Sequence, residues 1–341
     1  MTLESPGRFL EAARRGIDWI CARQRADGSF CDGADGVGSY YKIPYALSLG
    51  GRQREALRLL EWVAENHLTP EGDFRAPERK ALSSSHDAWP VYSNAWLVLG
   101  AQRVGRWDMA LRGVDFLGRY QTPAGGFYAL DGDTRIHEPV CTSWGGLAAL
   151  ATGRLAEACR AGDLLVRLVE SQPDPTRFYA RMDIDGNLVT DVPPGEELYY
   201  YVDATRKQQI YYNPGIALIL LAHLYRATGQ TKYLSAGKEI VAFAERCADD
   251  VYRFPPSGKL GLGCALMYQL TRRDEDLTGA IAVAEYLTET QTAEGFWRLP
   301  DVEPYTPRSD FDGTEIWLDV TAEFSTFLME IASRLGAGIE T

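Results

Sequence analysis

Gln121-Thr122-Pro123-Ala124-Gly125-Gly126-Phe127 is a turn that follows an amphipathic helical pattern, and the chain repeats it. Gln24-Arg25-Ala26-Asp27-Gly28-Ser29-Phe30 and Gln291-Thr292-Ala293-Glu294-Gly295-Phe296-Trp297 are close copies. Less complete copies follow at 67–74, 172–178 and 247–254. Recurrence at a spacing of roughly 45 to 75 residues is typical of a repeat architecture. Six copies, each at the end of a helix, predict six stacked helical hairpins.

Twelve segments have the helical spacing of apolar residues, i, i+3, i+4 and i+7. Six are amphipathic, with one charged face: 6–23, 52–66, 106–120, 155–171, 231–247 and 275–290. Six are rich in small and apolar residues: 39–49, 91–103, 140–151, 212–227, 258–271 and 318–335. A helix that is apolar nearly all round is buried on all sides, whereas an amphipathic helix touches water on one face. The alternation predicts an all-α protein, a single (α/α)6 toroid domain over 1–341 with inner and outer rings of helices.

The composition is that of a globular protein: 45% of residues are apolar and 24% are charged. The net charge of −12 argues against nucleic acid and anionic membrane surfaces as partners, because both attract Lys and Arg. No run of about 18 apolar residues that would span a bilayer is present. The first fifteen residues lack an apolar signal core, so we expect a cytoplasmic protein. The six cysteines show no CxxC spacing, which favours reduced, buried thiols.

Long connections mark one end of the predicted ring. Short links such as Gly50-Gly51 join an inner helix to the next outer helix, whereas the opposite links are long. These long links are 31–38, 75–90, 128–139, 179–211 and 298–317. Long connections inside a compact domain are usually functional, so this end is predicted to hold the active face; the alternative is that they only cover apolar surface. The Tyr-rich segment around 179–211 is predicted to be a lid-like insertion.

The pattern helix-Gln-x-x-x-Gly-x-aromatic resembles the QW repeats of the terpenoid cyclase and protein prenyltransferase superfamily. The segments 116–127 and 286–297 carry the resemblance best, and it extends over nearly the whole chain. The resemblance implies an (α/α)6 toroid with a central cavity, in a bacterial branch of this superfamily. The repeat itself is a stability device: its Gln can bond the carbonyls left free at a helix end, and its aromatic residue packs under the next helix.

The motifs of the active families are incomplete in this chain. The stretch nearest to the Asp-x-Asp-Asp acid motif of class II terpene cyclases, Asp131-Gly132-Asp133-Thr134, precedes its inner helix by several residues. The Asp-x-Cys zinc pattern of protein prenyltransferases is absent. Cys141 and Cys264 lie near inner-helix starts, as zinc-binding cysteines do in lanthionine cyclases, but no His stands in a matching motif. We therefore expect no metal and no cofactor.

A second resemblance competes with the first. The segment 222–234, AHLYRATGQTKYL, is similar to the hairpin phrase of six-hairpin glycosidases, uronyl hydrolases and sugar 2-epimerases. Those families share the (α/α)6 ring and place carboxylates or His in its mouth. The fold alone cannot decide between the two groups of families.

The strongest catalytic candidates are carboxylates around the last inner helix. Asp319 and Glu323 are four residues apart and share one helix face, and Asp312 precedes them in the last long connection. Inside a ring, each of the pair is expected to raise the pKa of the other. The alternative is an ion pair with Arg or Lys of a neighbouring helix. Paired carboxylates beside Trp317 would also suit a sugar site.

Histidines supply a second set of candidates. His86 beside Asp87 precedes the second inner helix, and His137 precedes the third. Imidazole titrates near neutrality and can serve as an acid or base; the alternative is a solvent-exposed loop residue. His67 and His223 lie in helical patterns and are predicted to be structural.

Substrate-binding candidates are aromatic and polar residues at the same end. Lys42 either projects into the cavity or reaches out to water, and the sequence favours neither alternative. Lys259, between Gly residues at a helix start, suits an anionic group. Most of the Tyr residues of the long insertion are as well explained by packing that insertion down. The full set is Tyr41, Lys42, Trp89, Trp144, Tyr201, Tyr212, Asn213, Lys259 and Trp317.

These features predict an enzyme that uses acid–base catalysis in the central cavity on a small, partly apolar organic substrate. The preferred reaction is that of a terpenoid-cyclase-like cyclase, isomerase or lyase. The first alternative is a carbohydrate-active hydrolase, lyase or 2-epimerase, and the second is a toroid that binds a ligand or partner without catalysis. A small molecule is the expected partner, with no nucleic acid and no membrane span. The sequence does not indicate the oligomeric state.

Overall fold

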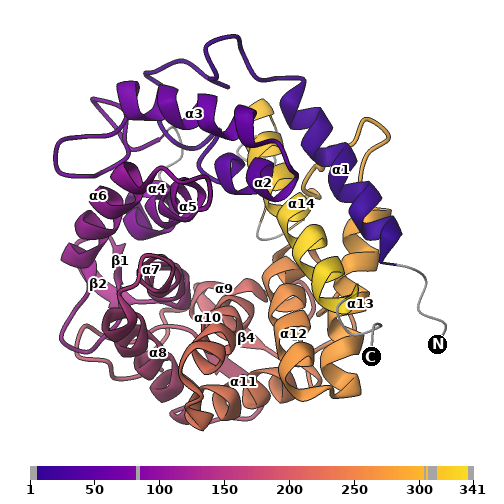
Figure 1. Cartoon of the computed structure of the whole chain (residues 1–341). Helices are drawn as coiled ribbons and strands as arrows, with labels where there is room; N and C mark the ends of the chain where they lie inside the picture. Colours follow the sequence, from indigo (N-terminus) through magenta and orange to yellow (C-terminus); the bar gives the residue numbers. More distant parts are fainter. Residues whose placement is uncertain (1–5, 82–84, 303–304, 306–312, 337–341) are drawn as a thin grey trace.

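Twelve long helices alternate between an outer and an inner ring in the computed structural model, which describes residues 6–81, 85–302, 305 and 313–336 (Figure 1). The outer helices are α1 (Gly7–Cys21), α3 (Gln53–Asn66), α6 (Trp107–Leu117), α8 (Leu155–Glu170), α11 (Thr231–Ala244) and α13 (Asp274–Glu289). The inner helices are α2 (Ile43–Leu49), α5 (Pro90–Arg103), α7 (Pro139–Ala151), α10 (Tyr212–Thr228), α12 (Gly258–Thr271) and α14 (Thr314–Gly336).

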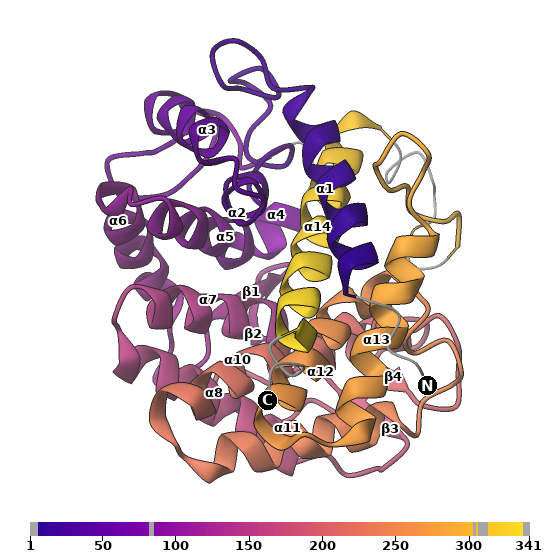
Figure 2. The same ribbon diagram turned by 45° about the vertical axis from the view of Figure 1, so that its right-hand side comes forward.

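The inner helices form a closed ring. Each one contacts the inner helix of the next hairpin, from α2 through α5, α7, α10 and α12 to α14, and α14 contacts α2 again. The first outer helix, α1, packs along α14, as both views show (Figures 1 and 2). The predicted all-α toroid is therefore confirmed. No helix among the described residues is long and apolar enough to cross a membrane.

Two inner helices begin four residues away from their predicted starts. The first, predicted from residue 39, begins at Ile43, with Pro44 in its first turn. Proline is favoured there because its missing N–H would have no partner within the helix. The last, predicted from residue 318, begins at Thr314. This earlier start adds Glu315 to the same helix as Asp319 and Glu323.

The long connections contain short elements that the helical periodicity did not predict. Strands β1 (Tyr128–Asp131) and β2 (Thr134–His137) pair as an antiparallel hairpin, and β3 (Arg177–Tyr179) pairs with β4 (Tyr201–Asp203). The short helices are α4 (Ser85–Ala88) and α9 (Glu197–Tyr200). The stretch compared with the terpene cyclase acid motif thus forms the β1–β2 turn, with Gly132 at a φ of 57°.

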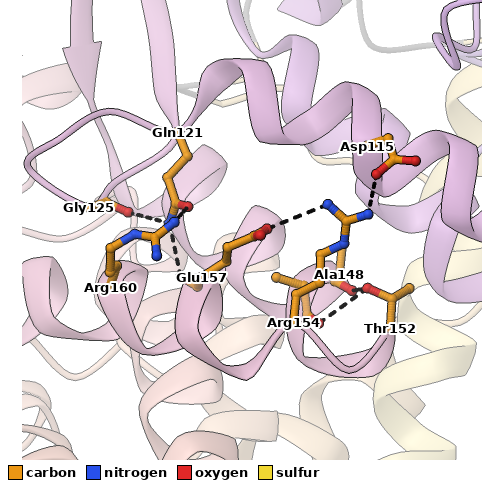
Figure 3. Close-up of polar contacts among 9 residues, drawn as sticks. Asp115, Gln121, Gly125, Ala148, Thr152, Arg154, Glu157 and Arg160 are labelled. Atoms are coloured by element: carbon orange, nitrogen blue, oxygen red, sulfur yellow. Dashed lines mark hydrogen bonds and ion pairs between the residues drawn. The ribbon is translucent and has the colours of Figure 1, made fainter.

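The repeated turn joins neighbouring outer helices (Figure 3). Gln121 Nε2 donates to the backbone oxygens of Gly125 (2.8 Å), in its own turn, and of Glu157 (2.9 Å), on α8. Arg160, one turn further along α8, donates from Nη2 to Gln121 Oε1 (2.6 Å). Gln therefore bonds its own turn and the outer helix of the next hairpin. The expectation that it bonds carbonyls left free at a helix end is wrong, because one acceptor lies in the turn and the other in the first turn of α8.

The two close copies make the same contacts. Gln24 bonds Gly28 (3.0 Å) and Glu55 of α3 (2.8 Å), and Gln291 bonds Gly295 (2.8 Å) and Ala12 of α1 (2.9 Å). In each copy an Arg of the contacted helix donates to the Gln oxygen, Arg58 in the first and Arg15 in the last. The last copy closes the ring between α13 and α1.

Glycine is required in the repeated turn. Gly125 has a φ of 109°, a left-handed conformation that side chains disfavour, and a Cβ there would lie 2.4 Å from the Arg160 backbone oxygen. The turn therefore rests directly on the backbone of the next outer helix. Phe127, at the end of the turn, packs its ring against Gly145 of α7.

Candidate active site

Four charged side chains from three inner helices meet inside the ring. Lys42, which caps the N-terminus of α2, places Nζ 2.8 Å from Asp319 Oδ2 and 3.0 Å from Glu323 Oε2, both on α14. Lys259, in the first turn of α12, bonds Glu323 Oε1. We call Lys42, Lys259, Asp319 and Glu323 the ionic cluster. Their side chains are 3%, 11%, 18% and 10% exposed, respectively.

Two sequence-based alternatives are thereby decided. Lys42 projects into the ring and does not reach out to water. The two carboxylates form ion pairs with lysines of neighbouring helices, which was the alternative to an unpaired acid. An ion pair of this kind stabilises little by itself when buried, because both charges lose their hydration. The protonation of the two carboxylates depends on how many lysines each one contacts: Glu323 contacts two and Asp319 contacts one.

The two carboxylates have pKa values shifted in opposite directions. Burial raises the pKa of Glu323, but the ammonium groups of Lys259 and Lys42 outweigh it and lower this pKa to about 2. For Asp319, burial outweighs the attraction of Lys42, and the charge of Glu323 adds to it, so the pKa of Asp319 is raised. The expectation that each raises the pKa of the other therefore applies to Asp319, whereas for Glu323 the direction is wrong.

Tyrosines from two other inner helices surround the cluster. The Tyr92 hydroxyl, on α5, donates to Glu323 Oε1 (3.1 Å), although α2 lies between α5 and α14 in the ring. This contact across the ring shows that the cluster faces the interior. Lys259 Nζ lies 5.7 Å from the ring centroid of Tyr92 and 5.6 Å from that of Tyr212, on α10. The ring faces thus attract the ammonium group.

Tyr41 and Trp144 lie beside Tyr92, and we call Tyr41, Tyr92, Trp144 and Tyr212 the aromatic wall. Tyr41, which is buried, lies 5.1 Å from Lys42 Nζ and 5.7 Å from Tyr92. Burial and the nearby carboxylate of Asp319 raise the pKa of Tyr41 well above its ordinary value. Trp144, on α7, meets the edge of Tyr92 at a centroid distance of 5.8 Å. All six inner helices therefore contribute side chains to the cluster or its aromatic wall, α2 through Lys42 at its N-cap position.

A second buried ion pair holds the same end of the ring. Glu138, before α7, accepts a hydrogen bond from Trp89 Nε1 (2.8 Å) and another from Arg181 Nε (3.0 Å). Arg181 also bonds Asp131 Oδ2 (2.8 Å) and stacks on the ring of Tyr200 at 4.1 Å. Burial raises the pKa of Glu138. Trp89 was expected to bind substrate; in the structure it is a partner of Glu138.

The predicted histidines do not join the ionic cluster. His137 is buried and its Nε2 lies 3.0 Å from Thr122 Oγ1 and 3.3 Å from the Ile184 oxygen, so it ties the β1–β2 connection to the insertion. Burial lowers the pKa of His137, which favours the neutral imidazole. His86 meets the edge of Tyr41 at 5.1 Å and borders the aromatic wall. Asp87 is exposed. A catalytic role for these three residues stays a prediction.

The remaining candidates are spread over the same end. Tyr201 packs on Tyr179 (5.2 Å) in the small β3–β4 sheet, and Asn213 is buried in the first turn of α10. Trp317 packs on Phe296 (5.1 Å between ring centroids) and lines a hollow of about 390 Å³. The other residues around this hollow are Trp19, Arg23, Thr292, Glu294, Phe296 and Arg298. Asp312 lies outside the described residues.

The sequence alone missed several residues of this end. Tyr92 lies in the first turn of α5, and nothing in its spacing indicated a bond to Glu323. Glu138 and Arg181 lay in two different connections, and only the folded ring brings them together. All six cysteines are free thiols, and within the described part of the chain no three His, Cys, Asp or Glu side chains are placed to hold a metal ion.

Solved structures with the same ring are enzymes of different kinds. A GH76 α-mannanase from Bacteroides thetaiotaomicron is 13% identical, with 98% of this chain and 97% of that chain covered and a TM-score of 0.66. A D-mannose isomerase is 10% identical (98% and 99% covered, TM-score 0.69). A type II terpene cyclase from Scytonema, in complex with geranylgeranyl dihydroxybenzoate, is 14% identical (98% and 100% covered, TM-score 0.58).

The chain has the α/α toroid fold. Identities this low show the fold alone, and the fold is shared by enzymes that act on sugars and on terpenoids. No protein-family model matches the chain, and no curated protein matches its sequence. The toroid predicted from the QW-like repeat is therefore supported by both groups of enzymes that the sequence resembles, and the choice between them rests on the site.

Proposed function

We propose that the protein is an enzyme that uses acid–base catalysis inside the ring on a small, partly apolar organic substrate, in a cyclisation, isomerisation or elimination. One observation carries this proposal. Asp319 and Glu323 lie one helical turn apart, yet their surroundings move their pKa values in opposite directions. Proteins give two neighbouring carboxyl groups different pKa values so that one acts as the acid and the other as a charged stabiliser.

Asp319 is the proposed proton donor. Lys42 holds its Oδ2, while its Oδ1 is buried and has no hydrogen-bond partner among the described residues. We place the proton of Asp319 on Oδ1, because Lys42 occupies Oδ2. In the reaction, the O–H bond of Asp319 breaks and a new C–H or O–H bond forms on the substrate, which becomes positively charged. The substrate cation later loses a proton to water, which leaves Asp319 ionised at the end of the cycle.

Glu323 is the proposed electrostatic stabiliser. Lys42 and Lys259 keep it ionised over the whole neutral range, so it is a fixed negative charge close to the reacting centre. Its fixed charge offsets part of the positive charge of the two ammonium groups, which would otherwise repel a developing cation, and it needs no reorganisation during the reaction. The faces of Tyr92 and Trp144 would add to this, since aromatic rings attract cations and also pack against apolar groups.

A carbohydrate-active hydrolase, lyase or 2-epimerase is the second candidate function. Its support is the pairing of two carboxylates with Tyr92, Tyr212 and Trp144, because aromatic faces and carboxylates are what sugar sites combine. The α-mannanase and the D-mannose isomerase have the same ring. Burial of the cluster favours the first candidate, since sugar chains need an open groove.

The two candidates are separated by incubating the purified protein in D2O with two sets of probes. Geranylgeranyl dihydroxybenzoate represents the first candidate; D-mannose and α-1,6-mannotetraose represent the second. Chromatography coupled to mass spectrometry detects an isomer that has gained one deuterium in the first case, and fructose, separated from mannose, or shorter sugars in the second. Conversion of the sugars alone would overturn the first candidate.

Substitutions then test the residues. Asp319→Asn and Glu323→Gln are expected to lose about a hundredfold or more of the activity. The matched control is Asp115→Asn, which removes a carboxylate from an exposed ion pair on the outside of the ring. Full activity in both cluster variants would remove these residues from the mechanism.

A further inference from the structure

A third carboxylate lies on the face of α14 that carries the ionic cluster. Glu315, Asp319 and Glu323 follow one another at intervals of four residues, so their side chains lie along one side of the helix. Glu315 is in the first turn, nearest the end of the ring where the long connections run. Burial increases inward along this row: Glu315 is half-buried, the Asp319 side chain is 18% exposed and that of Glu323 is 10% exposed.

Glu315 differs from its two neighbours in having no bonded partner. Across the described residues, neither a hydrogen bond nor an ion pair reaches its carboxylate. Its Oε1 rests on the backbone of Gly38, where a Cβ would collide with it. The charged groups around it are Asp35 before Gly38, Arg79 in the next long connection, and Asp319 on its own helix.

These surroundings keep a large fraction of Glu315 protonated at neutral pH. Burial is the largest cause, the like charges of Asp319 and Asp35 add to it, and Arg79 opposes it; together they raise the pKa of Glu315 to about 7. A carboxyl group that is half protonated near pH 7 can take a proton from water and release it again. Glu323, by contrast, is held ionised by two lysines and cannot do so.

We propose that Glu315 delivers protons to Asp319 from the end of the ring. Side chains four residues apart on a helix have Cβ atoms about 5–6 Å apart, which brings two carboxyl groups within reach directly or through one water molecule. In the transfer, the O–H bond of Glu315 breaks and an O–H bond forms on Asp319. The Glu315 anion then takes a proton from bulk water. Glu315 acts through Asp319 and does not touch the substrate.

This inference rests on the proposed function, because a donor that is consumed in each cycle must be reloaded. Asp319 has little direct access to water, because it is largely buried and Lys42 occupies its Oδ2. Glu315 is more exposed and free of such a partner in the described structure. It therefore connects the acid to water without opening the aromatic wall.

The first test needs no substrate. Carbon-13 NMR of labelled carboxyl groups follows the titration of Glu315 in the wild-type protein and in D319N, and of Asp319 in the wild-type protein and in E315Q. We expect the pair to titrate with coupled midpoints, Glu315 near pH 7, and the Glu315 midpoint to fall by about one pH unit in D319N, because the charge that Asp319 carries after it has given up its proton is removed. The midpoint of Asp319 should fall in E315Q. The control E330Q, which removes a carboxylate bonded to Arg334 two turns beyond the cluster, should change neither midpoint.

A Glu315 midpoint in the ordinary range of glutamate, or one that D319N leaves unchanged, would overturn the proposal. These titrations are independent of turnover, so they can fail while the proposed function stands, and they can succeed where no probe is converted.

The second test uses whichever probe is converted. E315Q should lower kcat about tenfold with KM unchanged, and E315A should regain activity when acetate is added, because a small acid can take the place of the missing carboxyl group. E330Q should retain wild-type activity. Unchanged kcat in E315Q, or a loss that acetate does not restore in E315A, would exclude proton delivery even if the two carboxyl groups are coupled.

Discussion

Gln291 Nε2 lies 2.9 Å from the backbone oxygen of Ala12, although 279 residues separate the two in the chain. Arg15, one turn further along α1, donates from Nε to Gln291 Oε1 at 3.0 Å. The same arrangement joins α6 to α8 through Gln121 and α1 to α3 through Gln24. Ring closure therefore uses the contact that also joins consecutive hairpins.

Replacing the ring-closing glutamine should lower stability. Gln291→Ala leaves the Gly295 and Ala12 oxygens without their donor, and a lost partner for partly buried groups costs about 1–2 kcal/mol of the free energy of unfolding. Urea denaturation measures the change. Gln121→Ala should cost about as much. Gln230→Ala, an exposed position, is the control and should stay within about 0.5 kcal/mol of the wild type; equal losses in all three variants would contradict the role of the turn.

Two glycines with left-handed backbones should respond differently to alanine. Gly125 has a φ of 109° and a Cβ there would lie 2.4 Å from the Arg160 oxygen, whereas Gly153 has a φ of 83° and open space around it. Both variants incur about 1 kcal/mol for the unfavourable conformation. Gly125→Ala should lose a further 1–3 kcal/mol, roughly the cost of an overpacked contact. Equal unfolding free energies for the two variants would show that the turn does not rest on α8.

The ionic cluster should make stability depend on acid pH. Because Lys259 and Lys42 lower the pKa of Glu323 to about 2 from its ordinary 4.5, its contribution is present above pH 4.5 and is lost as the pH falls toward 2. Glu323→Gln removes this contribution, so the unfolding free energy should fall less steeply between pH 4.5 and 2. At neutral pH the variant should be less stable by about 3–5 kcal/mol, since two buried ammonium groups lose their shared partner.

Urea denaturation at a series of pH values provides the measurement. Gln230→Ala, which changes no charge, should keep the wild-type dependence. A Glu323→Gln protein as steep as the wild type below pH 4.5 would mean that Glu323 is not held ionised by the lysines.

The Glu138–Arg181 ion pair should anchor the long insertion to the ring. Glu138→Gln leaves the largely buried Arg181 with Asp131 as its remaining ion-pair partner, and we expect a loss of about 2–3 kcal/mol. Hydrogen exchange in β3 and β4 should become faster. Asp115→Ala, which breaks an exposed pair with Arg154, is expected to cost less than about 1 kcal/mol and to leave that exchange unchanged. Unaltered exchange in Glu138→Gln would separate the ion pair from the anchoring of the insertion.

The fold was predictable because each of its determinants is local. The Gln-Gly-aromatic turn, the apolar helices and the charged helices each occupy a short stretch, and their alternation is enough to specify two rings. The contact made by Gln121 was not predictable, because Glu157 is 36 residues away and its carbonyl has no sequence signal. The strands β1 and β2 were missed because four residues each are too few to show a period.

The sequence predicted that the four residues of the ionic cluster lie at one end of the ring, but it did not predict the directions of their pKa shifts. Lys42, Lys259, Asp319 and Glu323 were expected at one end of the ring because inner helices all begin there. The lysine that each carboxylate meets depends on how α2 and α12 pack beside α14, across separations of up to 281 residues. That packing decides the directions of the two pKa shifts. Glu315 escaped notice for a simpler reason, since α14 was expected to begin after it.

The antiparallel packing of α1 against α14 has a consequence for the order of the hairpins. Gly16 lies against Ser325 and Thr321, so Gly7 and Gly336, at the far ends of these helices, are on the same side of the ring. Around the ring no hairpin is first or last. A circularly permuted chain that begins at α8, with a flexible peptide between Gly336 and Gly7, would keep every turn that joins one outer helix to the next. The ring that the chain forms should therefore not depend on which hairpin is translated first.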